Sequence, residues 1–404
     1  MLCHNGLPRW TLRTEVLVKI IHTSDWHIGR RFERHPLEAD QRAFLGWLAA
    51  EVEDRGVDLV IIAGDIYDRA MPSEEAVAVL DDGIDAIRAA GAEIALISGN
   101  HDSARRLGFG ARRQAMGGVH VFADERNAPV PKRLRFGDVE VALLGIPFLD
   151  PALVSGVYGD DQEVPRRRSH ESVLVSALDA GRANFGDLTG IPSIAIAHAF
   201  VAGSQTSDSE KTLAVGGADH VDAGIFGSFD YVALGHIHRP QTLGAPTIAY
   251  SGSPLAYSYS EEAPKSVRLI DVSTSGIESI ENLPIPIGRP VATLTDSIEN
   301  LISLPTYDQY SEHWVAAELT DETTVLQPLE RLQARFPFAT TIRYRGPGGG
   351  PVSAPDLTQG AVEDREPSEV VLEFLSEIRQ RDVTEAEEAL VVDAVNAAER
   401  SVNR

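Results

Sequence analysis

The chain has 404 residues with a formal net charge of −24, and 43% of its residues are hydrophobic while 24% are charged. The length predicts two or three domains, and the composition is that of a folded globular protein, which excludes wholesale disorder. The single cysteine, Cys3, excludes an internal disulfide framework and a cysteine-rich zinc site. No apolar run approaches the ~18 residues of a membrane span, and the N-terminus lacks the apolar core of a secretory signal, so we expect a cytoplasmic protein without a membrane partner.

Strands and helices alternate along the first half of the chain, after residues 1–17, which fit no element and are predicted to be a disordered extension. Continuous apolar runs predict buried strands, whereas apolar residues three and four positions apart predict helices. Strands are expected at 18–22, 57–63, 92–98, 139–145, 193–198, 231–235, 247–250 and 267–272. Helices are expected at 37–54, 73–90 and 103–116. The alternation fades after Tyr231, so we predict an α/β fold over residues 18–285, a two-layered sandwich whose later strands extend the same sheet.

A stretch with two prolines and a glycine, at 283–289, predicts a domain boundary. Beyond it we expect a small α+β unit over 286–345, then a flexible linker over the glycine- and proline-rich residues 346–366, then a helical segment over 367–404. The α+β unit should contain strands at 291–295, 314–319 and 340–344 and a helix at 325–336. The terminal helices are expected at 368–381 and 384–400, the second with a capping box between Thr384 and Glu387.

Five short polar segments follow apolar runs and contain residue types that bind metals. They are Asp25-Trp-His27, Gly64-Asp-Ile-Tyr-Asp68, Gly99-Asn-His-Asp102, Ala197-His198 and Gly235-His-Ile-His238. The ends of strands are where α/β folds place their sites, and the adjacent glycines let the backbone approach a ligand closely. A lone histidine on an apolar strand is more often a packed core residue, but five such segments in this order are hard to obtain by chance.

The number and kind of these side chains indicate two metal ions. They offer more oxygen and nitrogen donors than one ion binds, and one aspartate can bridge two ions at roughly 3.5–4 Å. The mixture of imidazole, carboxylate and amide suits Mn, Fe or Zn better than Ca. Such a pair would polarise a phosphoryl oxygen and lower the pKa of a water molecule that becomes the nucleophile, while a histidine outside the ligand set would protonate the leaving oxygen.

The order D-x-H, G-D-x-x-D, G-N-H-D, a lone H and G-H-x-H resembles the calcineurin-like metallophosphoesterases. Within that superfamily the segments IIHTSDWHIGR, AGDIYDR, ISGNHDS, LGHIHRPQ and YSGSPLAYSYSE look like the SbcD family, the nuclease subunits of bacterial SbcCD complexes. The resemblance covers about residues 18–345 and, weakly, the terminal helices. It implies a DNA nuclease that acts as a 3′–5′ exonuclease on duplex ends and as an endonuclease on single strands and hairpins, within an ATP-dependent complex of DNA repair and recombination.

The resemblance also implies roles for single residues. One ion, most often Mn²⁺ in this family, would be held by Asp25, His27, Asp65 and His238. The other would be held by Asp65 as a bridge, Asn100, His198 and His236. His101 would be the histidine that binds no metal and acts as general acid or stabilises the transition state.

Four further residues near these motifs have two interpretations each. Asp68 either supports the ligands by hydrogen bonding or caps the next element. Ser253 lies in a segment that the family brings near the metals, but a plain tight turn explains it equally well. Arg30 and Arg31 directly follow the first motif, so we favour contacts with the DNA backbone over a solvated face paired with acidic residues. For the arginines at 166–168 we favour the solvated loop.

The family implies partners for the C-terminal parts of the chain. Residues 286–345 resemble a capping domain that contacts DNA, and the terminal helices resemble the part that docks on the coiled coil of an SbcC-type ATPase. The apolar stripe of the first terminal helix is typical of a partner surface, with packing on its own domain as the alternative. The sequence contains no Walker A motif, so ATP hydrolysis would come from the partner. The family expectation is a homodimer of this chain within a heterotetramer.

Two other functions compete with the DNA nuclease. A metallophosphoesterase that acts on a small nucleotide or phosphodiester would fit the same motifs, but a compact one-domain chain would favour it, and this chain is longer. A scaffold without catalysis would be expected to have lost ligands, and none is missing. The negative net charge argues against nucleic acid only in general, because phosphate contacts depend on local Arg and Lys.

Overall fold

The computed structural model of this chain describes residues 17–125, 129–154, 169–186, 188, 190–210, 220–345, 367–379, 381 and 383–402. The extension predicted over residues 1–17 (except Leu17), the arginines at 166–168 and the linker predicted over 346–366 lie outside the described residues. The contacts divide the chain into two compact units, Met1–Ala292 and Thr293–Arg404. This division falls a few residues after the boundary predicted at 285.

The first sheet of unit 1 joins strands from both ends of that unit. Its order is β14-β13-β1-β4-β5-β6, with β1, β4, β5 and β6 parallel and β13 and β14 antiparallel. Its strands are β1 (Val18–Thr23), β4 (Leu59–Ile62), β5 (Glu93–Ile97), β6 (Val119–Phe122), β13 (Ser266–Ser273) and β14 (Gly276–Pro284). The pairing of β13 with β1 sets Ile270 opposite Ile20 and so closes the unit.

The strands between β6 and β13 form a second sheet, which corrects the expectation that the later strands extend the first. Its order is β11-β12-β10-β9-β8-β7, parallel in the middle and antiparallel at both edges. Its strands are β7 (Lys132–Phe136), β8 (Val139–Ile146), β9 (Ser193–His198), β10 (Tyr231–Gly235), β11 (Gln241–Leu243) and β12 (Ala245–Tyr250). A strand covered on both faces is apolar throughout, so its sequence does not reveal which sheet it joins.

The two sheets pack face to face, because alternate side chains of each strand point to opposite layers. In β4, Leu59 and Ile61 lie in the core between the sheets, together with Ile194 of β9. Val60 and Ile62 lie instead in the core beneath the helices. The predicted α/β class and sandwich are therefore confirmed, with the two sheets as the layers of the sandwich.

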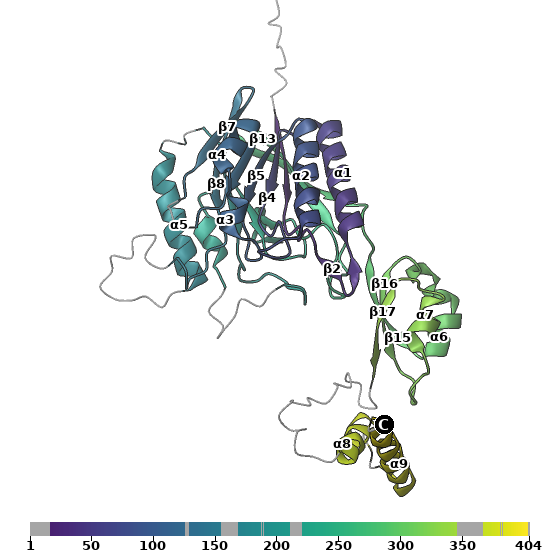
Figure 1. Ribbon diagram of the computed structural model, residues 1–404. Coiled ribbons are helices and arrows are strands. Elements are labelled where there is room, and N and C mark those ends of the chain that lie inside the picture. The colour runs from purple at the N-terminus through teal and green to yellow at the C-terminus, as the bar shows by residue number, and fades with distance from the viewer. Residues whose placement is uncertain are drawn as a thin grey trace, which may run out of the picture. The chain divides into compact units, whose positions relative to one another are not determined.

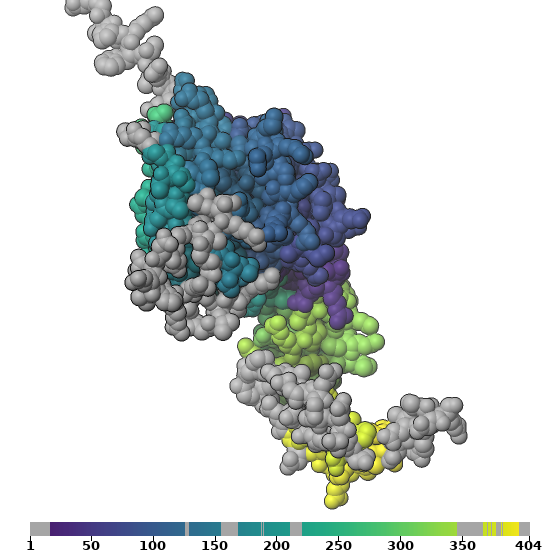
Figure 2. All heavy atoms as spheres, turned by 60° about the vertical axis from the view of Figure 1, so that its left-hand side comes forward, coloured from purple at the N-terminus to yellow at the C-terminus, as the bar shows by residue number. Residues whose placement is uncertain are grey.

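Helices cover the outer face of each sheet. Helices α1 (Glu38–Arg55) and α2 (Glu74–Ala89) pack on the first sheet, and α5 (His170–Phe185) packs on the second (Figure 1). On the face shown in Figure 2, the blue and teal segments of this unit adjoin one another. Helix α5 is not among the predicted elements. Strands such as β4 and β9 are buried along their whole length, so side chains that meet a ligand can lie only where these strands end.

The helix predicted at 103–116 is broken in the structure. It is replaced by α3 (Ala104–Leu107), α4 (Ala111–Gln114) and the 3-10 turn η1 (Ala115–Gly117). Gly110 separates the two short helices with a φ of +76°, a left-handed conformation that favours glycine and ends the helical hydrogen bonding. The other short elements of unit 1 are β2 (Arg31–Phe32), β3 (His35–Pro36) and the 3-10 turn η2 (Ala223–Phe226).

The second unit contains strands and helices in the mixture expected from its sequence. Its sheet has the order β15-β16-β17, with β15 (Val291–Asp296), β16 (Trp314–Leu319) and β17 (Ala339–Tyr344). Its helical elements are α6 (Ile298–Ser303), the 3-10 turn η3 (Pro305–Tyr310), α7 (Pro328–Gln333), α8 (Pro367–Arg379) and α9 (Glu385–Val402). Helix α7 is shorter than the predicted helix because it begins at Pro328, a residue suited to the first helical position.

The predicted capping box of the last helix is confirmed. The main-chain N–H of Glu387 donates to Oγ1 of Thr384 at 3.4 Å, and the N–H of Thr384 donates to Oε2 of Glu387 at 3.0 Å. None of the helices in the described ranges combines the length and the apolar character of a membrane span.

Candidate metal centre

The predicted ligands lie at the carboxyl ends of strands from both sheets. Asp25 and His27 follow β1, Asp65 follows β4, and Asn100 follows β5. From the second sheet, His198 ends β9, and His236 and His238 follow β10. The sheets meet at this edge, where the main-chain N–H of His236 donates to Oδ1 of Asp25 at 3.0 Å. The structure therefore brings all seven predicted ligands into one buried site.

The backbone turns sharply where it presents these side chains. Asp25, His27, Asp65 and His236 have φ angles of 54°, 42°, 50° and 101°, which non-glycine residues rarely adopt. Main-chain bonds hold two of these turns together: the N–H of Asp25 donates to the oxygen of Gly64 at 3.0 Å, and that of His27 to the oxygen of Asp65 at 2.9 Å. Such strain persists where the surrounding structure fixes it, and it is common at functional sites.

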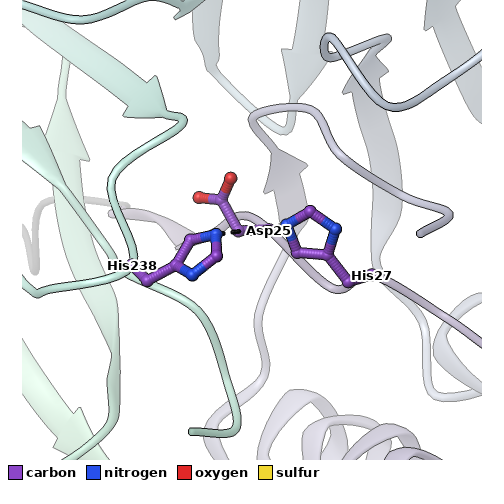
Figure 3. A group of neighbouring side chains, drawn as sticks. All are labelled: Asp25, His27 and His238. Carbon is purple, nitrogen blue, oxygen red and sulfur yellow. Dashed lines mark hydrogen bonds between the residues drawn. The ribbon is translucent and has the colours of Figure 1, made fainter. Parts of the chain in front are cut away.

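Asp25, His27 and His238 form the first cluster of possible ligands (Figure 3). The Nε2 atoms of the two histidines are 3.1 Å apart, and Nε2 of His27 is 3.5 Å from Oδ2 of Asp65. Burial lowers the pKa of His27 well below its ordinary value, which favours the neutral form that binds metals. Imidazole nitrogens that converge on one buried point beside carboxylates fit a divalent cation.

Asn100, His198 and His236 form a second cluster, which shares Asp65 with the first. Nε2 of His198 is 2.9 Å from Oδ1 of Asn100 and 3.5 Å from Oδ2 of Asp65. Nδ1 of His236 is 3.2 Å from the same Asn100 oxygen. Asp65 thus lies near both clusters through one carboxylate, which is the position that a bridging ligand needs.

The charges of Asp65 and His198 depend on each other. Burial disfavours both ionised forms, yet His198 and the neighbouring histidines hold the pKa of Asp65 well below its usual range, and Asp65 raises the pKa of His198 to about 9. Nδ1 of His198 donates to the main-chain oxygen of Ala63 at 2.9 Å, so Nε2 is the atom that would bind a cation in place of its proton. Burial also raises the pKa of Asp25. The donor set is one that a bound cation would stabilise.

His101 and Asp68 lie beside the first cluster. The main-chain N–H of His101 donates to Oδ1 of Asp65 at 2.9 Å, and its Nδ1 donates to the main-chain oxygen of Asp68 at 2.8 Å. These bonds fix the ring and leave its Nε2 4.0 Å from Oδ2 of Asp65. The Asp68 carboxylate lies 3.7 Å from Nδ1 of His27, a buried nitrogen without a hydrogen-bond partner, and 3.3 Å from NH1 of Arg30. Asp68 therefore lies near a ligand without a hydrogen bond to it, and its supporting role stays a prediction.

The structure separates the two arginines that were predicted together. Arg30 donates to Asp68 and, at 3.1 Å, to the main-chain oxygen of Ser209, and its guanidinium lies 4.9 Å from the ring centre of Tyr257. Arg31 is exposed and donates to the main-chain oxygen of Arg34 at 3.1 Å. Arg30 is thus fixed beside the ligands, whereas Arg31 bonds within its own turn.

Ser253 is buried in a hydrogen-bond network behind the ligands. Its Oγ donates to the main-chain oxygen of Leu255 at 2.8 Å and accepts from Nζ of Lys265 at 2.9 Å. Its main-chain N–H donates to the oxygen of His238 at 3.1 Å. Ser253 therefore contacts the backbone of a ligand and not its ring.

Glycines allow the segments that carry the ligands to approach one another closely. A Cβ on Gly99 would lie 2.2 Å from Oδ1 of Asp65, and one on Gly64 would lie 2.4 Å from Nδ1 of His198. A Cβ on Gly235 would lie only 1.9 Å from the main-chain oxygen of Ala63. Side chains at these places would displace the ligands themselves.

Several supporting residues were not predicted because they are distant in the sequence. Nε2 of Gln41, in α1, donates to the main-chain oxygen of His27 at 2.8 Å. Nδ1 of His238 lies 2.6 Å from Oγ of Ser209 and 3.4 Å from Oε1 of Glu261. Although burial disfavours its charged form, Lys265 holds the pKa of Glu261 well below its usual range. The only sequence signal for this group is the quoted segment YSGSPLAYSYSE, which ends at Glu261.

Comparisons with known proteins identify the family of this chain. The chain is 30% identical over 333 residues to the SbcD subunit of nuclease SbcCD from Escherichia coli K12, which covers 78% of this chain and 82% of that protein. It is 30% identical over 325 residues to the SbcD subunit of nuclease SbcCD from Staphylococcus epidermidis, which covers 79% and 83%. A solved dimetal phosphatase from Danio rerio is 12% identical, with a TM-score of 0.36, over 66% of this chain and 98% of its own. The family model for calcineurin-like phosphoesterases matches residues 18–240, so the chain belongs to this family and is a metal-dependent phosphodiester hydrolase.

Proposed function

We propose that this chain is a two-metal-dependent DNA nuclease, the nuclease subunit of an SbcCD-type ATP-dependent complex of DNA repair and recombination. It acts as a 3′–5′ exonuclease on duplex ends and as an endonuclease on single strands and hairpins. The observation that carries the proposal is the convergence of metal-binding side chains from both sheets around Asp65. Its likeness to the SbcD subunit of nuclease SbcCD over 78% of the chain supports DNA as the substrate.

The ligands and the proton donor have separate tasks in this proposal. When bound, two divalent ions, most suitably Mn²⁺, supply Lewis acidity toward the phosphoryl oxygens and lower the pKa of a water molecule. Asp65 would hold both ions, and the histidines of the two clusters would complete their ligand sets. His101, whose Nδ1–H donates to the main-chain oxygen of Asp68, would transfer a second proton from Nε2 to the leaving oxygen when the ring carries both protons.

Arg30 provides a fixed positive charge for the DNA backbone. Its anchoring to Asp68, to the main-chain oxygen of Ser209 and over Tyr257 means that little side-chain freedom remains to be lost when a phosphate binds. Arg31 and the capping domain, 286–345, are further DNA-contacting parts in this proposal. A net charge of −24 does not prevent DNA binding, because phosphate contacts need only local cations.

The terminal helices supply the contact with the ATPase in this proposal. Val371 and Phe374 of α8 are each 38% exposed, and one turn of helix separates them. An apolar helix face of this kind fits the coiled coil of an SbcC-type ATPase. Two copies of this chain and the ATPase subunits would form a heterotetramer in the cytoplasm.

Cleavage of a hairpin-ended DNA duplex in Mn²⁺ tests the proposal, with the wild type compared with Asp65→Asn. We expect the variant to lose more than about 100-fold of the activity, since even residues that only support metal ligands contribute 10- to 100-fold. Asp230→Asn is the matched control, because Asp230 accepts hydrogen bonds from Ser193 at the opposite end of β10. Equal cleavage by Asp65→Asn would refute the site. Hydrolysis of a small chromogenic phosphodiester but not of DNA, with and without the ATPase, would refute DNA as the substrate.

A further inference from the structure

We propose that Ser209 and Glu261 are positioning residues that fix the tautomer and the orientation of the His238 ring, so that its Nε2 faces the metal. The inference rests on the proposed function only in treating His238 as a metal ligand. It assigns a task to a buried polar group that the two ligand clusters do not use.

The direction of the hydrogen bonds determines the tautomer. Oγ of Ser209 donates its one proton to Oε1 of Glu261 and lies 2.6 Å from Nδ1 of His238. Because that proton is committed to the carboxylate, the hydroxyl oxygen can only accept from the ring, so Nδ1 carries the hydrogen. The lone pair is then on Nε2, the atom that lies 3.1 Å from Nε2 of His27. This chain of hydrogen bonds from His238 through Ser209 to Glu261, the relay, thus prepares His238 as a ligand before any metal binds.

The charge of Glu261 keeps the relay in this direction. Its side chain is 1% exposed and pairs with Lys265, whose Nζ also donates to the main-chain oxygen of His238 at 3.1 Å. The Oγ atoms of Ser253 and Ser258 lie 3.3 and 3.4 Å from oxygens of the same carboxylate. A buried ion pair adds little net stability on its own, and removal of one partner is costly. Here the pair contacts both the ring and the backbone of one ligand, which points to orientation of that ligand as its task.

Two single substitutions interrupt the relay without altering a ligand. In Glu261→Gln, the amide group can donate to Ser209 and reverse the hydrogen bonds, which favours the wrong tautomer. In Ser209→Ala, the hydroxyl is lost and Nδ1 keeps only the Glu261 oxygen at 3.4 Å. We expect each variant to bind one of the two Mn²⁺ ions about 10- to 100-fold more weakly, which is the effect of removing a partner of a ligating histidine. The double variant should be no weaker than the worse single variant, because both act through one ring nitrogen.

Calorimetric titration of the full metal-free chain with Mn²⁺, without DNA, measures this directly. Asp230→Asn removes a hydrogen-bonded carboxylate far from the ligands and should bind both ions as the wild type does. Histidine ring ¹⁵N spectra of the metal-free chain should show the Nδ1–H tautomer of His238 in the wild type and its loss in Glu261→Gln, which a merely structural role would not produce. Unchanged affinity for both ions in Ser209→Ala and Glu261→Gln would overturn the inference. A wild type that binds two Mn²⁺ but does not cleave DNA would contradict the proposed function and leave this relay intact.

Discussion

Asp102 joins two of the loops that carry metal ligands, and Asp102→Asn tests how much that junction contributes. Oδ2 of Asp102 accepts from the N–H groups of Ile66 at 3.0 Å and Gly99 at 2.9 Å, and Oδ1 accepts from Tyr67 at 2.9 Å. An asparagine can keep its oxygen on Ile66 and Gly99, but its NH₂ group then faces the N–H of Tyr67, donor against donor. One buried donor left without an acceptor costs about 1–3 kcal/mol.

Hydrogen exchange at the Tyr67 amide measures this cost where it arises. A change of 1–3 kcal/mol corresponds to a roughly 5- to 150-fold loss of protection in the metal-free chain. Asp222→Asn is the control, because Asp222 is an exposed cap that accepts from Gly224 at 2.6 Å, and it should leave Tyr67 unchanged. If Asp102→Asn also left the protection of Tyr67 unchanged, the main-chain bonds between the loops, and not this carboxylate, would hold them together.

Two further predictions concern the contact between the sheets. Gly235→Ala should abolish tight Mn²⁺ binding in calorimetry, because its Cβ would lie 1.9 Å from the main-chain oxygen of Ala63. Gly46→Ala is the control and should bind Mn²⁺ normally, because there is open space around Gly46 in α1. Normal Mn²⁺ binding by both variants would refute the argument. Burial, with a contribution from Arg268, lowers the pKa of His22 from 6.5 to about 3. His22 therefore binds a proton below pH 6.5 in the unfolded chain, but only below about pH 3 in the folded chain. This contribution to stability is complete above pH 6.5 and is lost as the pH falls, by about 3 kcal/mol at pH 4.5. Urea unfolding in EDTA measures the free energy of unfolding at pH 7.5 and 4.5. The difference between the two pH values should be about 3 kcal/mol smaller in His22→Gln than in the wild type. An equal difference would mean that His22 is already charged in the folded chain.

The ligand motifs could be predicted because their information is local. In each, an apolar run ends in polar residues such as Asn100 and His101, and the end of a strand places such residues at the edge of its sheet. Asp25 and His27 directly follow β1, and the structure brings both near Asp65. A tight turn at each strand end is sufficient for this, so no long-range information is needed.

The division into two sheets and the support behind the ligands could not be predicted in the same way. An apolar strand such as β9 satisfies the sequence pattern in either sheet, and only pairing and packing decide its place. Ser209 and Glu261 are 52 positions apart, and neither lies in a segment with regular periodicity. The prediction of one helix at 103–116 is wrong for a local reason, because Gly110 interrupts a pattern that is otherwise helical.

The site depends on the packing of the two sheets because each ligand cluster draws on both. His27 comes from the first sheet and His238 from the second, and their ring nitrogens are 3.1 Å apart. The same contact is maintained inside the core by the hydrogen bond of 2.9 Å between His22 and Tyr231. An ion held between the sheets would bind the folded chain and not the unfolded one, and a ligand at 100 times its Kd stabilises the folded state by about 2.7 kcal/mol. The strained turns at Asp25, Asp65 and His236 lie at this contact, so an ion bound there would offset part of their backbone strain.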